Sequence, residues 1–146
     1  MGNISEDINS KFDNNRFKAF INIKYTANWI NSKEVEFFKS YGLSPQQYNI
    51  LRILRGAADR IKVQLVKDRM IERAPNATRL MDKLVEKNLI HRFRCEHDRR
   101  VVYVNINDEG LLLLSEIDTK IEHLDMLKRL TEEEAQLLSD LLDKIR

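Results

Sequence analysis

The sequence predicts a mainly α-helical protein with a small β-wing, a winged helix-turn-helix with further helices at both ends. Two observations carry this prediction. Apolar residues recur every three to five positions over most of the 146 residues, which is the spacing of an amphipathic helix. Residues 90–106 instead alternate and are rich in valine, as strands are. The predicted order is a long helix, three helices, a two-stranded hairpin and two helices.

Residues 5–40 are predicted to form one amphipathic helix, with a possible break at Asn14–Asn15. Such a helix is long for so small a protein. Two of its aromatic residues, Tyr25 and Trp29, are candidates for lining an effector pocket. The alternative is that both are ordinary core residues.

The next helix begins at the segment "LSPQQY". Ser44 is a favoured N-cap residue, and Pro45 suits the first helical position, where a missing N–H costs no helical hydrogen bond. Gln47 stands where a capping box would return a hydrogen bond to the cap residue. The helix is expected to run to about Gly56.

Two further helices are predicted, over residues 63–70 and 75–88. At about 100° per residue, the second of them separates into two faces. Ala77, Leu80, Met81 and Leu84 share an apolar face, whereas Asn76, Arg79, Lys83 and Lys87 share a second face that forms a basic stripe.

The two strands, "IHRFRC" and "RVVYVNI", meet at the hairpin tip "EHDR". Cys95 and His97 at this tip raise the question of a metal site. Metal sites need three or four ligands, and this pair supplies two, so we expect no metal and no cofactor. Cys95 is expected to be a half-buried apolar residue. A redox-responsive Cys95, activated by Arg94 and Arg99, is the alternative.

Two helices complete the chain. Asn107 is predicted to cap a helix of about 15 residues that includes "DEGLLLLSEI". Thr131 and Glu134 form a capping box for a last helix that runs to the end of the chain.

The end segments, residues 5–40 and 108–146, carry more apolar surface than a winged core of residues 43–107 can cover. We therefore predict that they are the dimerisation helices of a homodimer, because two-fold dimers are the commonest closed assemblies. The alternative is a monomer in which these helices fold back on their own core.

Charge is segregated along the chain, although the formal net charge is only +2. Residues 52–104 hold 14 Lys and Arg against 7 Asp and Glu, a net charge of +7, so the rest of the chain carries −5. A basic region between acidic ends is typical of a surface that binds polyanions. The sequence contains neither an apolar run of about 18 residues nor a signal peptide, so we expect a cytoplasmic protein that binds no membrane.

These features predict a protein that binds double-stranded DNA. An α-helix fits the major groove, where Arg79 and Lys83 would meet bases and phosphates. The hairpin would lie beside it, with Arg99 as the candidate for insertion into a minor groove. The alternative is a winged-helix protein-interaction module that does not bind DNA. An enzyme is not expected and no catalytic residue is assigned, because the sequence shows no nucleophile–base pair, phosphate loop or metal cluster.

Three segments, "LSPQQYNILRIL", "NATRLMDKLVEKNLIHR" and "CEHDRRVVYVNINDEG", resemble the MarR (multiple-antibiotic-resistance regulator) family of bacterial transcription factors. The resemblance implies a single MarR-like domain over residues 1–146 and a homodimer with interlocking end helices. It also implies a sequence-specific regulator, expected to be a repressor, that binds a pseudopalindromic site and responds to a small ligand.

The resemblance and the residue patterns together assign the candidate site. Asn76, Thr78 and Arg79 would lie on the DNA-facing part of the recognition helix, and Arg99 at the tip of the wing. Asp98 would hold a neighbouring arginine in place. The expected DNA contacts are Asn76, Thr78, Arg79, Lys83, Arg94, His97 and Arg99, and the expected wing-orienting residues are Asp98 and Arg100.

The chain departs from the family pattern at three positions. It has Asn88 and Asn107 where the family commonly has glycine and threonine. Asparagine tolerates the left-handed conformation and caps helices, so both residues are expected to preserve the fold. Pro75, near the start of the recognition helix, is less usual and is expected to influence which side chains reach bases.

Overall fold

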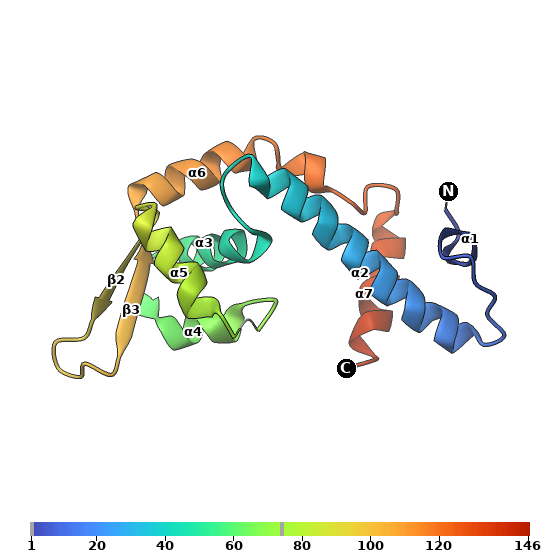
Figure 1. The fold of residues 1–146 in the computed structure, drawn as a ribbon, viewed down its shortest axis with the longest axis horizontal. Helices are drawn as coiled ribbons and strands as arrows, with labels where there is room; N and C mark the ends of the chain where they lie inside the picture. The colour runs from blue at the N-terminus through green and yellow to red at the C-terminus, as the bar shows by residue number, and fades with distance from the viewer. Residues whose placement is uncertain (1, 74) are drawn as a thin grey trace. The chain divides into compact units, whose positions relative to one another are not determined.

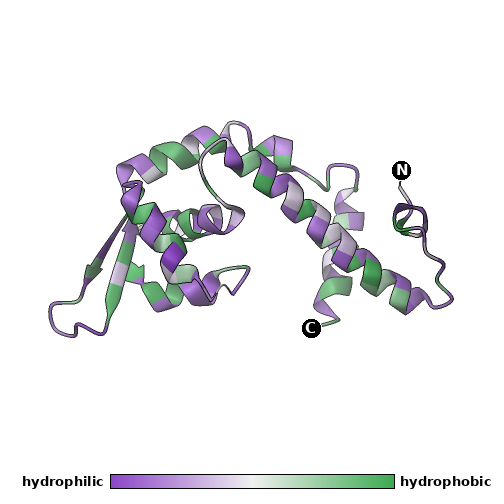
Figure 2. Cartoon of the chain, in the orientation of Figure 1, coloured by the Kyte–Doolittle hydropathy of each residue, from purple (hydrophilic) through white to green (hydrophobic). Residues whose placement is uncertain are grey.

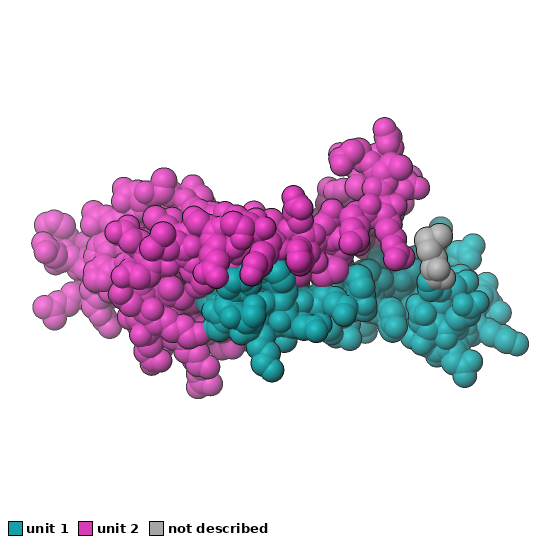
Figure 3. Space-filling model, turned by 90° about the horizontal axis from the view of Figure 1, so that it is seen from above, with its two compact units in different colours: residues 1–45 teal, residues 46–146 magenta. Residues whose placement is uncertain are grey.

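The computed structural model describes residues 2–73 and 75–146. The chain divides into two compact units, residues 1–45 and residues 46–146 (Figure 3). The N-terminal unit holds the first two helices. The C-terminal unit holds the winged core and the helices that follow it.

The N-terminal unit contains α1 (Ile4–Asp7) and α2 (Asn15–Lys39). Asn14 caps α2, because its side-chain oxygen accepts hydrogen bonds from the backbone N–H groups of Arg16 (2.8 Å) and Phe17 (3.3 Å). The predicted break at Asn14–Asn15 is confirmed. The pattern over residues 5–40 therefore belongs to two helices.

The winged core follows the predicted order of elements (Figure 1). The helix after the first unit begins at Pro45, as expected, whereas the helix predicted to begin at Pro75 begins two residues later. In chain order the elements are α3 (Pro45–Ala57), β1 (Ile61–Lys62), α4 (Val63–Arg69), α5 (Ala77–Glu86), β2 (Ile90–Arg94), β3 (Val102–Ile106), α6 (Asp108–Asp118), the 3-10 helix η1 (Ile121–Leu124) and α7 (Glu132–Asp143).

The core of the C-terminal unit consists of the side chains that helical spacing placed inward. Leu51 on α3 and Met81 and Leu84 on α5 are fully buried, and each such side chain contributes about 1.5–3 kcal/mol through removal from water. Gln47 is also buried, and its amide nitrogen donates a hydrogen bond to the backbone oxygen of Leu80 (3.4 Å). This bond links α3 to the recognition helix α5.

Among the described residues, the sheet has three antiparallel strands in the order β1-β3-β2. The hairpin pairs β2 with β3, from Ile90 opposite Ile106 to Arg94 opposite Val102. We call this hairpin, with its connecting tip, the wing. The prediction of two strands missed β1, which pairs along the other side of β3. A strand of two residues is too short to show alternation in a sequence.

Two asparagines connect the end of α5 to the start of α6. Asn88 has a φ of 57°, the left-handed conformation expected at this position. Asn107 occupies the N-cap position of α6, but its side chain makes no cap hydrogen bond. Its amide nitrogen donates instead to the side-chain oxygen (3.2 Å) and the backbone oxygen (3.3 Å) of Asn88. The prediction of a side-chain cap at Asn107 is therefore wrong. Asn88 and Asn107, the two asparagines that depart from the family pattern, instead form hydrogen bonds with each other.

The C-terminal helices differ from the prediction in length. Helix α6 has 11 residues where about 15 were expected, and η1 follows it. The capping box of α7 is confirmed. The Thr131 hydroxyl accepts a hydrogen bond from the backbone N–H of Glu134 (3.2 Å), and the Glu134 carboxylate accepts one from the backbone N–H of Thr131 (2.9 Å).

Apolar side chains are exposed along α2 and along the C-terminal helices. Figure 2 shows hydrophobic residues interleaved with hydrophilic ones along these helices. Phe17 on α2 is 54% exposed, Leu112 on α6 is 69% exposed and Leu137 on α7 is 58% exposed. These side chains belong to the segments expected to dimerise, and dimerisation stays a prediction. No helix in residues 2–73 and 75–146 is long and apolar enough to cross a membrane.

Gly110 lies in the first turn of α6, where this helix approaches the segment after α5. A Cβ atom at this position would lie 2.4 Å from the backbone oxygen of Leu89 and 2.6 Å from the side chain of Ile106. Both distances are far below van der Waals contact, and the first involves backbone that cannot rotate away. The close approach of α6 therefore requires glycine.

We predict that Gly110→Ala destabilises the protein by about 1–3 kcal/mol, because the new methyl group forces α6 away from Leu89. Gly56 provides the control, because a Cβ atom there meets nothing within 4 Å. Replacement of this helical glycine by alanine should be neutral or stabilise by up to about 1 kcal/mol. Thermal unfolding followed by circular dichroism measures both changes. Equal melting temperatures for the two variants would contradict the packing argument.

Candidate nucleic-acid interface

The basic stripe predicted on the recognition helix lies on the outer face of α5. Met81 and Leu84 are buried and fix the side of the helix that faces the core. Thr78, Arg79 and Lys83 are exposed on the remaining surface of the helix. A polyanion that approaches α5 from solvent meets this hydroxyl and these two cations, with the exposed carboxylate of Glu86 in the last turn of the helix.

Asn76 stands at the start of α5. It occupies the N-cap position and is exposed, but its side chain makes no cap hydrogen bond. Because α5 begins at Ala77 rather than at Pro75, Asn76 precedes the first helical residue. Its amide group extends the polar surface of α5 beyond the end of the helix.

The tip of the wing is held by hydrogen bonds to its backbone. The backbone N–H of Cys95 donates to the oxygen of Val101 (2.9 Å), and the backbone N–H of Val101 donates to the oxygen of Asp98 (3.0 Å). The Arg94 guanidinium donates to the backbone oxygen of Arg99 (3.1 Å). Arg94, expected as a DNA contact, thus also braces the tip and leaves the Arg99 side chain exposed.

Asp98 contacts the arginine that follows the tip. One of its carboxylate oxygens accepts hydrogen bonds from the backbone N–H of Arg100 (3.1 Å) and from the Arg100 guanidinium (3.2 Å). The Arg100 side chain is nevertheless 92% exposed. This is the contact that an orienting role for Asp98 and Arg100 requires, and the role itself stays a prediction.

A cavity of about 620 Å³ lies between α4, α5 and the wing, and we call it the basic groove. None of the described residues that line it carries a carboxylate, whereas several carry a positive charge. Thr78 connects the basic groove to the stripe on α5. The cationic residues that line the basic groove are Lys62, Lys67, Arg92, Arg94 and Arg100.

Sequence reasoning missed four polar residues of the basic groove, namely Lys62, Gln64, Lys67 and Arg92. The positive charge of residues 52–104 was the signal that pointed to them. Helix α4 has only seven residues, which is too short for periodicity to separate an inward from an outward face. The structure shows that Lys67 of this helix and Lys62, which directly precedes its first residue, line the same cavity as the wing.

An ion pair joins the wing to the recognition helix. The Arg92 guanidinium on β2 lies 2.5 Å from the Asp82 carboxylate on α5. Both side chains are partly exposed, so the pair is worth little as stability, since exposed ion pairs typically contribute about 0–1 kcal/mol. Its effect is to hold β2 in place beside α5.

Cys95 and His97 lie at the wing tip, half-buried and exposed respectively. No group of three His, Cys, Asp or Glu residues within the described part of the chain is placed to hold a metal ion.

Phe93 and Tyr103 stack on each other across the strands, and the Arg60 guanidinium lies over both rings, 4.9 Å from the centroid of Tyr103. These contacts cover one face of the wing. A redox role for Cys95 stays untested.

Tyr25 and Trp29 lie on α2 and are 41% and 44% exposed. They are therefore not core residues of the chain by itself. Neither lines the basic groove or the smaller cavity of about 370 Å³ between α4 and the start of α5. Their assignment to an effector pocket stays a prediction.

We predict that Asp98→Ala speeds hydrogen exchange at the backbone N–H of Arg100 by about tenfold, because the loss of a hydrogen bond worth roughly 1.4 kcal/mol changes an equilibrium tenfold. Exchange followed by NMR at single amides measures this effect. Glu96→Ala provides the control, since it removes an exposed carboxylate from the same tip. If both variants exchange like the parent protein, Asp98 does not order the wing.

The family comparison assigns this arrangement to transcriptional regulators. A sequence model of the SarA/Rot family of transcriptional regulators matches residues 34–117. The chain is also 28% identical over 130 residues to the HTH-type transcriptional regulator MhqR of Bacillus subtilis (strain 168), a similarity that covers 88% of this chain and 89% of that protein.

Two solved structures have a similar fold. A MarR transcription factor from Planctomyces limnophilus is 32% identical and has a TM-score of 0.71, over 91% of this chain and 98% of that one. A mutant of MarR from E. coli, complexed with operator DNA, is 24% identical and has a TM-score of 0.72, over 90% of this chain and 99% of that one. Together they confirm the predicted mainly α-helical winged helix-turn-helix fold.

Proposed function

This chain belongs to the SarA/Rot family of transcriptional regulators and is a MarR-family winged-helix regulator, and we propose that it is a homodimeric repressor that binds a pseudopalindromic DNA site. Members of this family are transcription regulators and not enzymes, in agreement with the sequence. The repressor acts in the cytoplasm, where its DNA is, and a small ligand releases it. The similar structure of a MarR mutant with operator DNA supports the choice of DNA as the partner.

The observation that carries the proposal is the continuity of the basic groove with the outer face of α5. Both surfaces include Thr78, and both present cations to solvent. The major groove of B-DNA admits one α-helix, and the phosphates at its edges then lie beside that helix. The basic groove stands where one of these phosphate strands runs when α5 occupies the major groove.

Each part of the surface then has its own task. Arg79 reads base edges, because arginine donates two hydrogen bonds to guanine, while Lys83 contacts phosphate. Asn76 and Thr78 contact the same strand at the start of α5. Arg99 at the wing tip enters the adjacent minor groove, where negative potential is concentrated.

The cations around the wing have supporting tasks. Arg94 holds the backbone of the tip through the oxygen of Arg99. Asp98 orients Arg100, whose exposed guanidinium meets phosphate in the basic groove. His97, exposed at the same tip, contacts the backbone of the DNA.

The apolar surfaces of α2, α6 and α7 support the homodimer. Exposed leucines such as Leu112 and Leu137 gain stability when a second copy covers them, at roughly 25 cal/mol for each Å² removed from water. A two-fold dimer also matches the symmetry of a palindromic site. Tyr25 and Trp29, exposed on α2, provide aromatic surface for a small ligand that shifts the distance between the two recognition helices.

Selection of the purified protein on random duplex DNA at about 150 mM salt tests this function, because non-specific phosphate binding is weak there. The expected result is a two-fold-symmetric motif with half-sites about one helical turn apart. Failure to enrich any motif, with the protein folded and dimeric, would favour a protein-interaction module instead. A motif without symmetry would exclude the homodimeric reader.

We predict that Arg79→Ala weakens binding and relaxes base preference at one position in each half-site, at a cost of about 1–3 kcal/mol. Arg99→Ala should weaken binding with a smaller loss of preference, because the minor groove mainly distinguishes A·T from G·C. Fluorescence anisotropy on the selected duplex and on single-base variants of it measures both effects. Two variants that bind every duplex as tightly as the parent would overturn the docking geometry.

We also predict that Lys62→Ala and Lys67→Ala each reduce the slope of log K against log salt by about 0.9, the value for one lost phosphate contact. Base preference should stay unchanged, because phosphate contacts carry no sequence information. Lys144→Ala, at the exposed end of α7, is the control for a general change of charge. Identical slopes for Lys62→Ala and Lys144→Ala would remove the basic groove from the interface.

A further inference from the structure

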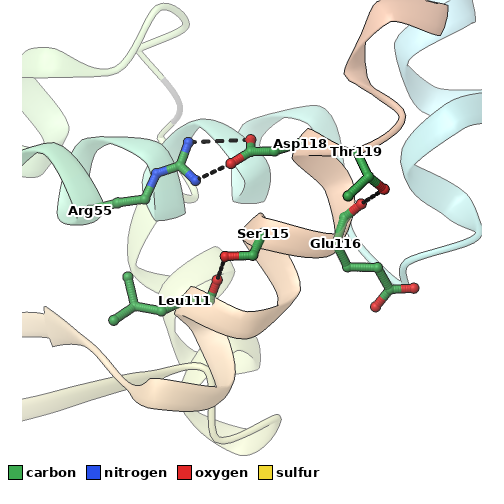
Figure 4. Close-up of polar contacts among 6 residues, drawn as sticks. All are labelled: Arg55, Leu111, Ser115, Glu116, Asp118 and Thr119. Carbon is green, nitrogen blue, oxygen red and sulfur yellow. Dashed lines mark hydrogen bonds and ion pairs between the residues drawn. The ribbon is translucent and has the colours of Figure 1, made fainter.

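An ion pair links the winged core to α6 at the point where the chain leaves that core. Arg55 lies in the last turn of α3, and Asp118 is the last residue of α6 (Figure 4). One guanidinium nitrogen lies 2.7 Å from one carboxylate oxygen, and a second nitrogen lies 3.4 Å from the other oxygen. Two parallel hydrogen bonds fix direction as well as distance between the two groups.

The position of Asp118 on its helix is unfavourable in the absence of this partner. The carboxyl end of an α-helix carries a partial negative charge, which disfavours an acidic residue there. The last turn of α6 contains no basic residue that would offset this effect. Arg55, by contrast, is favoured at the carboxyl end of α3. The hydrogen bond that Arg55 donates to Asp118 raises the pKa of Arg55 above its ordinary value.

Helix α6 is anchored to the core at both of its ends. Its first turn is packed through Gly110 against the backbone of Leu89, and its middle and last turn are held by the fully buried Leu114 and Ile117. The Arg55–Asp118 pair ties its last residue to α3. Beyond Asp118 the chain continues into η1 and α7, and Leu137, Leu138 and Leu141 of α7 are exposed. The pair therefore stands at the junction between the core and the segment proposed to dimerise.

We propose that Arg55 and Asp118 are a positioning pair, which fixes the angle between α6 and the winged core and thereby the spacing of the two recognition helices in the dimer. This inference rests on the proposed function. Neither residue lines the basic groove, so neither contacts DNA there. The pair acts through the geometry of the dimer, because two half-sites are bound together only when both recognition helices reach them.

The first test measures the spacing preference of the dimer. Duplexes carry the two half-sites of the selected motif at separations that change by single base pairs. The parent protein should prefer one separation about tenfold over its neighbours, whereas Asp118→Ala should show a preference below about threefold, because a loose α6 lets the recognition helices reach several separations. Affinity for a duplex with a single half-site should stay unchanged. Asp118→Asn, which keeps the size of the side chain, repeats the test with minimal disturbance of folding.

Charge reversal provides a rescue. Arg55→Asp and Asp118→Arg each break the pair, and the double variant restores opposite charges at the same two positions. Spacing preference should be lost in both single variants and recovered in the double variant. Asp143→Ala is the matched control, because Asp143, the last residue of α7, pairs with Arg146 three residues later and joins no two elements. If the pair only stabilised the fold, the single variants would lower the melting temperature without changing the preferred separation of the half-sites.

The second test works without DNA. Spin labels at Glu86→Cys on α5 and Glu116→Cys on α6, in a Cys95→Ser background and diluted with unlabelled protein, report the distance between the core and α6. Asp118→Ala should broaden the distance distribution. An unchanged distribution would overturn the positioning role, and so would a broadened distribution with an unchanged spacing preference. If the distribution broadens but the protein selects no DNA motif, Arg55 and Asp118 still fix α6 against the core. The proposed function would then be wrong, and so would the control of the spacing between recognition helices.

Discussion

The arrangement of this protein depends on one close contact, between the start of α6 and the segment that follows α5. Gly110 leaves no room for a Cβ atom against the oxygen of Leu89, and the same oxygen accepts a hydrogen bond from the backbone N–H of Asn107 (3.0 Å). Asn107 in turn binds Asn88, which turns the chain in the left-handed conformation. The recognition helix, both strands of the wing and α6 therefore meet at this point. Because the strand pairing begins there, at Ile90, an error at this contact would propagate to the wing tip.

The positive charge of the candidate interface depends on which cations are paired with carboxylates as well as on how many cations there are. Asp82 pairs with Arg92 and Asp98 pairs with Arg100, and both carboxylates remain partly exposed. The cations that remain, such as Arg79, face solvent. A polyanion thus meets a surface in which positive charge is held at defined positions. Fixed cations favour specific docking because less side-chain entropy is lost on binding.

The sequence predicts the elements where local chemistry dominates and fails where a contact is distant. Capping residues and helical periodicity identified α3, α5 and the capping box at Thr131, because these signals lie within one turn. The side chain of Asn107 was misassigned, because its partner Asn88 is 19 residues away and competes with the local cap. Strand β1 with Lys62, and Lys67 on α4, were missed because segments of two and seven residues are too short to show a period. The tip of the wing was recognised from its residue types, whereas the basic groove needed three elements to be placed together.

Three ion pairs, Arg92–Asp82, Arg100–Asp98 and Arg55–Asp118, share a feature that their energies do not explain. All are partly exposed, and pairs of this kind contribute about 0–1 kcal/mol, less than one buried leucine. Two of them join different elements, namely α5 with β2 and α3 with α6, and the third holds the residues of a turn. Apolar packing resists separation of these elements but specifies rotation weakly, because it is not directional. Two hydrogen bonds between planar groups specify rotation strongly. This is the physical basis of the positioning role proposed for Arg55 and Asp118, whose two hydrogen bonds act on elements that the apolar core stabilises.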